Sequence, residues 1–445
     1  MSPIVNQLPK TLQAVQTMSG FRELGRVERV VGLMIESVGP GFAKLGDVCW
    51  IEAGRDALNQ PQRMMSEVVG FKEGRLLLMP LGEMLPIAPG NRVSCSGQPF
   101  RVSVSPMLKG RVLDALGQPL DDRIDIPTTE RHPVHAIAPH PLRRKDIEDP
   151  LVVGVRAVDA MLTLGKGQRV GIFAGSGVGK STTLGMMARN TEADLNVIAL
   201  IGERGREVRE FIDLSLGEEG LQRSVVVVAT SEQPALLKIK AALVATTIAE
   251  YFREQGKNVL LMMDSLTRVA MALREVGLAT GEPPAMRGYT PSMFAFMPRL
   301  VERAGMSANG SITGLYTVLV EGDDMNEPVA DTVRGLLDGH IVLSRELADQ
   351  NHFPAIDVPA SISRVMNLLV SPEHRQQAGQ VRDWIATYRK SEDLINIGAY
   401  VAGSNPKLDK AVQMKPQIDA FLRQAVDDPS DWQASLGGLA QLGLS

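Results

Sequence analysis

The pattern of hydrophobic and polar residues changes at about residue 25. From Gly25 to Val104, short β-branched and apolar runs are separated by turns rich in Gly, Pro and Asn, which predicts a small β-barrel or sandwich over residues 25–104. The preceding residues, 1–24, have apolar side chains at helical spacing, namely Leu8, Leu12, Val15 and Met18. This spacing fits either a helix that binds a partner or a frayed terminus with scattered apolar residues.

Residues 105–370 follow a second pattern, in which apolar strand-like runs alternate with helical ones. The runs are, in order, QRVGIFA, STTLGMMARN, LNVIALIG, SVVVVAT and NVLLMMD. Such alternation predicts a parallel sheet that is covered by helices on both faces. Residues 127–142 interrupt it with four prolines and three histidines and no period, which predicts an extended surface linker, with metal binding by the histidines as the alternative.

The strand pattern stops at Val370. Ser371 and Pro372 fit the cap and first position of a helix, and Val381, Ile385 and Tyr388 then repeat on one helical face. We therefore expect a helical domain over residues 371–445, and the fold class is α/β, with a β-barrel before the parallel-sheet core and helices after it.

Composition narrows the class of protein. Hydrophobic residues make up 44% and charged residues 22% of the chain, and no run has the length of a membrane-spanning helix, so we expect a cytosolic protein of several domains. The net charge of -4 gives no sign of a nucleic-acid partner. The two cysteines, Cys49 and Cys95, imply neither a disulfide framework nor a zinc cluster.

A glycine-rich loop between a strand and a helix carries the clearest chemistry. Its glycines let successive backbone N–H groups face phosphate oxygens, and the helix N-terminus adds partial positive charge. Lys180 then reaches the outer phosphates of a nucleotide, and the Ser181 hydroxyl can bind Mg²⁺. A random glycine-rich turn is the alternative. The expected nucleotide-binding residues are Gly175, Ser176, Gly177, Val178, Gly179, Lys180, Ser181 and Thr182.

Two carboxylates follow apolar strands and should complete this site. Asp264 ends the run NVLLMMD, where it would help to hold Mg²⁺ through water, unless it merely caps the next helix. Glu203 follows LNVIALIG and is the candidate base that polarises the attacking water. The alternative for Glu203 is membership of the solvated charge run that continues to Glu210.

Several longer segments resemble the flagellar and type III secretion export ATPases, which are related to the catalytic subunits of rotary ATP synthases. They are GERGREVREF, VLLMMDSLTR, GEPPAMRGYTPSMFAFMPRLVERAG, VEGDDMNEP and FPAIDVPASISRVM, in addition to the loop AGSGVGKS. The resemblance runs from about Gly25 to Tyr400. It implies a RecA-like ATPase core that uses ATP and Mg²⁺ in a homohexameric ring at the inner face of the cytoplasmic membrane.

The resemblance also implies roles for single residues. Lys180 and Ser181 match the phosphate loop, Glu203 the catalytic glutamate and Asp264 the Walker B aspartate. Arg364 matches an arginine finger that acts on the ATP of a neighbouring subunit, with a structural ion pair as the alternative. Phe353 matches an aromatic side chain that packs on adenine, although it could be an ordinary core residue. The implied partners are export-gate membrane proteins, a regulatory or stator protein, a central stalk protein and complexes of chaperones with exported proteins.

Other functions remain open on the sequence. A rotary synthase subunit would share the site, but the sequence of the loop from Glu321 to Pro328 resembles that of the export branch. A non-catalytic ring subunit usually replaces the catalytic glutamate, whereas Glu203 is present here. An RNA translocase would need stacking aromatics and a basic groove in the barrel. Within the export branch, the sequence of the catalytic core favours flagellar over virulence export.

Overall fold

The computed structural model describes residues 23–55, 59–121, 123, 126–127, 130–320, 322 and 324–444. The chain divides into two compact units, residues 1–100 and 101–445. The helix considered for residues 1–24 lies almost entirely outside the described residues. The predicted domain boundaries at residues 104 and 370 stay predictions.

The first unit is a closed β-barrel, as expected for residues 25–104, although its last strand ends at Pro99. Around the barrel the strands follow the order β1-β2-β5-β4-β3-β6. Alternate residues of each strand point inward and form an apolar core that includes Ile35, Ile51, Leu78 and Val93. The strands are β1 (Gly25–Val31), β2 (Met34–Val38), β3 (Asp47–Arg55), β4 (Pro61–Lys72), β5 (Arg75–Pro80) and β6 (Arg92–Pro99).

The cysteines differ from the expectation. The structure joins Cys49 and Cys95 by a disulfide, although the sequence implied no disulfide framework. The pairing follows from strand register, because β3 and β6 are antiparallel neighbours that place Cys49 directly opposite Cys95. Two cysteines 46 residues apart carry no such register information in the sequence.

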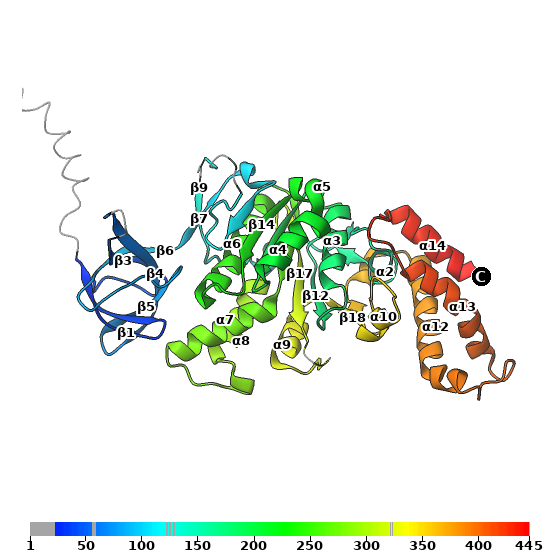
Figure 1. Cartoon of the computed structure of the whole chain (residues 1–445). Helices are drawn as coiled ribbons and strands as arrows, with labels where there is room; N and C mark the ends of the chain where they lie inside the picture. Colours follow the sequence, from blue (N-terminus) through cyan, green and yellow to red (C-terminus); the bar gives the residue numbers. More distant parts are fainter. Residues whose placement is uncertain are drawn as a thin grey trace, which may run out of the picture. The chain divides into compact units, whose positions relative to one another are not determined.

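The second unit is built on a nine-stranded sheet in the order β19-β18-β12-β17-β15-β13-β14-β8, with β16 beside β17 (Figure 1). All these strands are parallel except β16 and β19, so the prediction of a parallel sheet is confirmed. The strands are β8 (Val112–Asp114), β12 (Arg169–Ala174), β13 (Leu195–Ile201), β14 (Ser224–Ala229), β15 (Asn258–Asp264), β16 (Gly305–Met306), β17 (Ser311–Leu319), β18 (Gly339–Leu343) and β19 (Ile362–Ser363).

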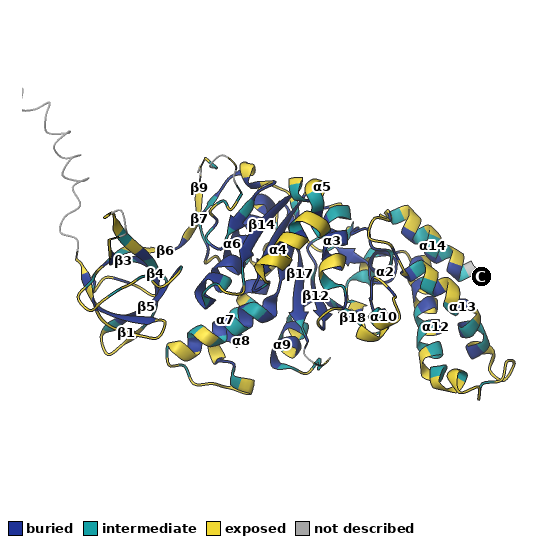
Figure 2. Ribbon diagram, in the orientation of Figure 1, coloured by how far each residue is buried: buried dark blue, intermediate teal, exposed yellow. Residues whose placement is uncertain are grey.

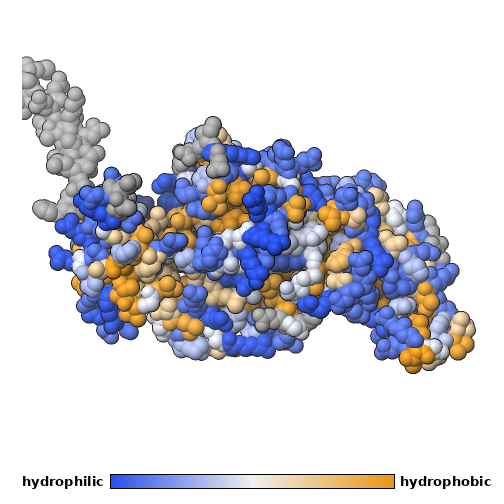
Figure 3. Space-filling view, viewed as in Figure 1, coloured by the Kyte–Doolittle hydropathy of each residue, from blue (hydrophilic) through white to orange (hydrophobic). Residues whose placement is uncertain are grey.

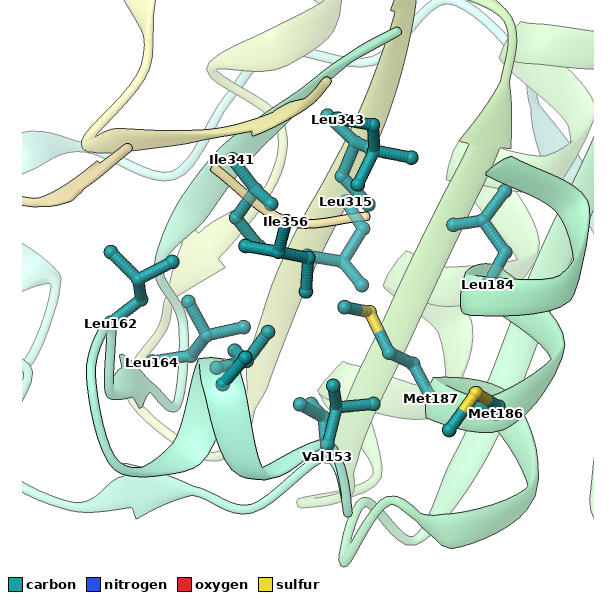
Figure 4. Packing of buried hydrophobic residues seen from close by; sticks show 14 of the residues in the cluster. Val153, Leu162, Leu164, Leu184, Met186, Met187, Leu315, Ile341, Leu343 and Ile356 are labelled. Carbon is teal, nitrogen blue, oxygen red and sulfur yellow. The ribbon is translucent and has the colours of Figure 1, made fainter. Parts of the chain in front are cut away.

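The two faces of this sheet are buried, as Figure 2 shows by the dark blue of its strands. On one face, side chains of α3 pack against the strands and against residues 151–164, and Figure 4 shows Leu184, Met187 and Leu315 at this contact. The long helix α6, nearly all of it buried, packs against β13, β14 and β15. Near-continuous apolar strands are expected where helices cover a parallel sheet in this way.

The helices of this core lie between and after the strands. They are α2 (Arg156–Asp159), α3 (Lys180–Asn190), α4 (Gly205–Glu210), α5 (Gly217–Gln222), α6 (Ala235–Glu254), α7 (Leu266–Ala279), α8 (Pro291–Val301), α9 (Pro328–Leu336), α10 (Arg345–Asp349) and α11 (Met366–Leu369). A π-helical turn, η3 (Phe211–Leu216), joins α4 to α5, and 3₁₀ turns are η1 (Pro106–Leu108), η2 (Pro141–Arg143) and η4 (Met286–Gly288).

Parts of the proline-rich segment 127–142 form regular structure. It contains the strand β9 (Glu130–Pro133), which pairs with β7 (Arg101–Val104), and the turn η2. The next residue, Val134, is fully buried and its carbonyl accepts a hydrogen bond of 2.7 Å from Arg303. The extended backbone of β9 agrees with the expected extended conformation and pairs with the edge that β7 offers, and the linker role of residues 127–142 stays a prediction. A second two-stranded pair is formed by β10 (Pro150–Leu151) and β11 (Leu164–Gly165).

Three helices complete the chain: α12 (Pro372–Asn396), α13 (Pro406–Leu422) and α14 (Trp432–Leu444). The predicted start of α12 is confirmed, since the Ser371 side chain accepts a hydrogen bond from the His374 N–H. The apolar face of these helices continues the core of the nine-stranded sheet. Their outer surface is largely hydrophilic, but Figure 3 shows an apolar group near the turn between α12 and α13, where Leu394, Ile397 and Val401 are exposed.

Candidate functional site

The glycine-rich loop follows β12 and leads directly into α3, at the carboxyl end of the sheet. Gly177 and Gly179 have φ angles of 80° and 85°, the left-handed region that side chains disfavour, so both positions need glycine. Val178 between them is buried and anchors the loop, while Ser176 and Gly177 are exposed. Ser181 and Thr182 are also exposed, on the first turn of α3. This geometry directs backbone N–H groups and a helix N-terminus outward, as phosphate binding requires.

Lys180 lies among the two predicted carboxylates. Its Nζ is 2.5 Å from Asp264 Oδ1 and 3.4 Å from Glu203 Oε1. Parallel strand order causes this meeting, because β13 and β15 are neighbours and both end at the same edge of the sheet. The structure thus brings together residues that are up to 84 positions apart in the sequence.

The structure also separates these carboxylates from their alternative roles. Ser265, not Asp264, caps α7, since its side chain accepts from the Arg268 N–H. Glu203 has a side chain only 18% exposed, whereas Arg206 of the following charge run is 87% exposed and pairs with Glu210. Asp264 and Glu203 therefore face the loop and not the solvent.

Burial and charge set the protonation of this cluster. Burial opposes the charge of Lys180, but the carboxylates of Asp264 and Glu203 outweigh it and raise the pKa of Lys180. Burial raises the pKa of Glu203, and the charge of Asp264 adds to this rise while Lys180 opposes it. A raised pKa makes Glu203 a better proton acceptor than an exposed glutamate.

The residues present fit Mg²⁺ in a site completed by a nucleotide. No group of three or more His, Cys, Asp or Glu side chains within the described ranges is placed to hold a metal on its own. Mg²⁺ is commonly held by one or two protein oxygens together with water and substrate phosphates. Asp264 Oδ1 accepts hydrogen bonds from Lys180 and, at 2.7 Å, from the Thr317 hydroxyl. The other oxygen, Oδ2, can therefore accept from a metal-bound water. The exposed Ser181 hydroxyl can supply a second oxygen.

Phe353 contacts the phosphate loop. A Cβ atom placed on Gly179 would lie 3.4 Å from two ring carbons of Phe353, so the ring packs directly on this glycine. The side chain is 41% exposed, which excludes an ordinary core role. It joins its successor through a cis Phe353–Pro354 peptide bond.

Arg364 lies at the amino ends of the parallel strands, opposite the edge that carries the phosphate loop. It follows β19, whose Ser363 pairs with Gly339 at the start of β18, and the Arg364 N–H donates to Asp338 O at 3.0 Å. Along β12 this level is about five residues, or ~16 Å, before the phosphate loop. The side chain is exposed, and no carboxylate of the described ranges is within ion-pair distance of it. Arg364 is therefore not brought to the Lys180 site of its own chain.

Two residues next to the site did not stand out in the sequence. Thr317 is fully buried in β17 and donates to Asp264; a hydroxyl inside the apolar run GLYTVLV was the available signal. Arg268 of α7 packs its side-chain stem against Gly202, so a Cβ atom at Gly202 would lie 2.6 Å from it. This contact, and a hydrogen bond from the Ser231 N–H to Glu203 O, hold the Gly202–Glu203 turn. Neither contact has a local sequence pattern.

Two family models and several known proteins are similar to this chain. Residues 154–363 match the model of the ATP synthase alpha/beta family, nucleotide-binding domain, and residues 370–441 match that of the T3SS EscN ATPase C-terminal domain. The flagellum-specific ATP synthase of Bacillus subtilis is 54% identical over 97% of this chain and 98% of its own length. The type 3 secretion system ATPase of Xanthomonas euvesicatoria is 51% identical over 94% of each chain.

A solved structure agrees with both. The assembled ATPase EscN in complex with its central stalk EscO, from the type III secretion system of enteropathogenic E. coli, superposes with a TM-score of 0.86 and 44% identity over 94% of this chain and 100% of that one. Among the residues that the structure describes, no helix is both long and apolar enough to cross a membrane. The barrel, the phosphate loop with its carboxylates and the C-terminal helices thus occur together in one chain, which belongs to the family of flagellum-specific and type III secretion ATPases.

Proposed function

We propose that this chain hydrolyses MgATP at the loop of residues 175–182 to drive protein export. The observation that carries the proposal is the contact of Lys180 with both Asp264 and Glu203 beside that loop. Loop N–H groups and Lys180 bind the phosphates, and Phe353 packs on the adenine. Ser181 and, through water, Asp264 would hold Mg²⁺, which would supply positive charge against the phosphate oxygens.

Glu203 acts on the attacking water. Its carboxylate lies 3.4 Å from Lys180 Nζ. Because Lys180 would bind the terminal phosphate, Glu203 can orient a water in line with that phosphate. Its raised pKa supports a role as proton acceptor. Phosphoryl transfer depends mainly on such positioning and charge, so these residues suffice for the chemistry on one side of the phosphate.

Positive charge on the other side of the terminal phosphate has to come from a second subunit. Arg364 is exposed and lies at the opposite edge of the sheet from its own phosphate loop. We infer that it reaches the ATP of a neighbouring subunit in a homohexameric ring. There its fixed charge would stabilise the transition state and raise kcat by a factor of about 10³ to 10⁵. The assembled state of the similar EscN supports this arrangement.

The cellular setting follows from the relatives. We infer a cytoplasmic ring, peripheral at the membrane, that engages a central stalk protein, a regulatory or stator protein, export-gate membrane proteins and chaperone complexes. The stalk in the EscN complex supports the first of these. Export of flagellar components is favoured by the flagellar relative at 54% identity, with virulence secretion as the second candidate at 51%. Deletion of the gene should then abolish flagellar assembly and motility; motile cells with a secretion defect would support the second candidate.

The test is phosphate release with MgATP over a protein dilution series, with particle size measured on the same samples. Wild-type specific activity should rise with concentration as rings form. Arg364→Ala should lose this rise and keep nucleotide binding, whereas Arg345→Ala, a change at another exposed arginine, should behave as wild type. Glu203→Gln should bind nucleotide but not turn it over.

The outcomes separate the candidate functions. Turnover that is independent of concentration would remove the shared site. Full activity in Glu203→Gln would assign the base elsewhere. Nucleotide binding without hydrolysis at any concentration would favour a non-catalytic ring subunit.

A further inference from the structure

The connector between α13 and α14, residues 423–431, is hydrogen-bonded to the nucleotide-binding core, and Gln424 contributes both side-chain and backbone bonds. The Gln424 side chain is 5% exposed and accepts from the Arg156 N–H at 2.8 Å. Its amide donates to Gly154 O at 2.8 Å and to Asp428 O at 2.7 Å. Its backbone N–H donates to Phe353 O at 3.0 Å. One residue of the C-terminal region therefore bonds the segment before α2, its own connector and the segment that carries Phe353.

Arginines of the core hold the same connector from two sides. Arg156 donates to the carbonyls of Phe421 and Arg423, at 3.1 and 2.7 Å, and pairs with Asp428 at 3.0 Å. Arg189, on the phosphate-loop helix α3, donates to Val426 O at 2.8 Å. The connector is thus bonded to α2 through Arg156 and to α3 through Arg189, in addition to the bonds of Gln424.

The hydrogen bond from the Gln424 N–H to the Phe353 carbonyl helps to position Phe353. Its successor is Pro354, which has no N–H, so the backbone here offers fewer hydrogen bonds of its own. The Gln424 N–H supplies one to the Phe353 carbonyl, while the Phe353 ring packs on Gly179. A shift of the connector would therefore move the ring relative to the phosphate loop.

We propose that Gln424 is a positioning residue for the nucleotide base, which sets Phe353 against the phosphate loop and couples base affinity to the C-terminal helices. The proposal rests on the proposed function, in which Phe353 packs on adenine. It deepens that function, because a partner that shifts α13 and α14 would then change the affinity for ATP, and by linkage ATP would change the affinity for that partner.

The experiment compares a ligand that has a base with one that lacks it, on the full chain. Binding of MgADP and of magnesium pyrophosphate is measured by calorimetry for wild type, Gln424→Ala, Phe353→Ala and the control Gln413→Ala, which removes an exposed glutamine of α13. We expect Gln424→Ala to weaken MgADP about tenfold and to leave pyrophosphate within about twofold, since only the base contact is disturbed. Steady-state kinetics should show a higher KM for ATP with nearly unchanged kcat.

A purely structural role would give another result. Equal weakening of both ligands, or no weakening of MgADP, overturns the proposal. In the background of Phe353→Ala, Gln424→Ala should cause no further loss of MgADP affinity, because Gln424 acts on the base only through the Phe353 ring. If Gln424→Ala does not fold, Gln424→Glu is measured instead; it keeps the acceptor for Arg156 and loses both side-chain donors, so the same selective loss is expected.

Failure of the proposed function is distinguishable. If Phe353→Ala itself leaves the ratio of the two affinities unchanged, the base does not lie on Phe353 and the placement of adenine is wrong. If Phe353→Ala changes that ratio and Gln424→Ala does not, the base site stands and the role of Gln424 is wrong.

Discussion

Replacing Thr317 with valine should weaken the metal site without disturbing the packing around it. The Thr317 hydroxyl donates to Asp264 Oδ1 at 2.7 Å and lies 3.3 Å from Met263 O. Valine has nearly the same shape, so the change removes a hydrogen bond and opens no cavity. The remaining partner of Oδ1 is Lys180 at 2.5 Å.

The magnitude follows from the kind of bond that is lost. A hydrogen bond to a charged group contributes about 1.5–3 kcal/mol, and here its acceptor is a carboxylate that stays buried. We expect a loss of ~2 kcal/mol in the free energy of unfolding. If about 1.4 of these ~2 kcal/mol come from orienting Asp264 Oδ2 toward the metal, the Mg²⁺ concentration for half-maximal turnover rises about tenfold.

Two measurements on the same variants test this reasoning: urea unfolding, and ATPase activity as a function of Mg²⁺ at saturating ATP. Thr317→Ser keeps the hydroxyl and should restore the Mg²⁺ dependence. Thr246→Val is a matched control, because Thr246 is also buried but donates to the carbonyl of Ala242 in α6. A wild-type Mg²⁺ dependence in Thr317→Val would refute the view that this hydroxyl orients Asp264.

Three further predictions concern titration and a buried ion pair. Burial raises the pKa of Asp159 to about 7, so its contribution to stability is present at low pH and is lost as pH rises from the unfolded value to 7; the melting temperature of the wild type should fall between about pH 4 and 7 and level off above that, with a smaller fall in Asp159→Asn. Turnover should be lost on acidification through the raised pKa of Glu203, at a higher pH than for an ordinary glutamate, as a pH–rate profile would show. Arg303→Met should cost about 3–5 kcal/mol in chemical unfolding by leaving buried Glu250 unpaired, and adding Glu250→Gln should recover part of it; an equal loss in the double variant would contradict this.

The sequence allowed prediction of the features that are local or that follow from strand order. The phosphate loop is a contiguous pattern, and Glu203 and Asp264 each end an apolar strand, so a parallel sheet brings them to one edge. Contacts between distant segments were not accessible in this way. The Cys49–Cys95 pair depends on barrel register, and the bond from Gln424 to Phe353 depends on how the C-terminal helices dock on the core.

The placement of the phosphate loop and Arg364 at opposite edges of one sheet restricts which assemblies can work. A contact that joins unlike edges is head-to-tail, and repeating it closes a ring only when the rotation between subunits allows closure. A two-fold symmetric dimer pairs one surface patch with itself, so it would complete both sites only if Arg364 and the phosphate loop belonged to the same patch. Under the shared-site proposal, a dimer that leaves Arg364 away from the other chain's phosphate loop would bind nucleotide without rapid turnover. A mixed ring with some Arg364→Ala subunits would lose, for each altered subunit, the site of one neighbour and not its own.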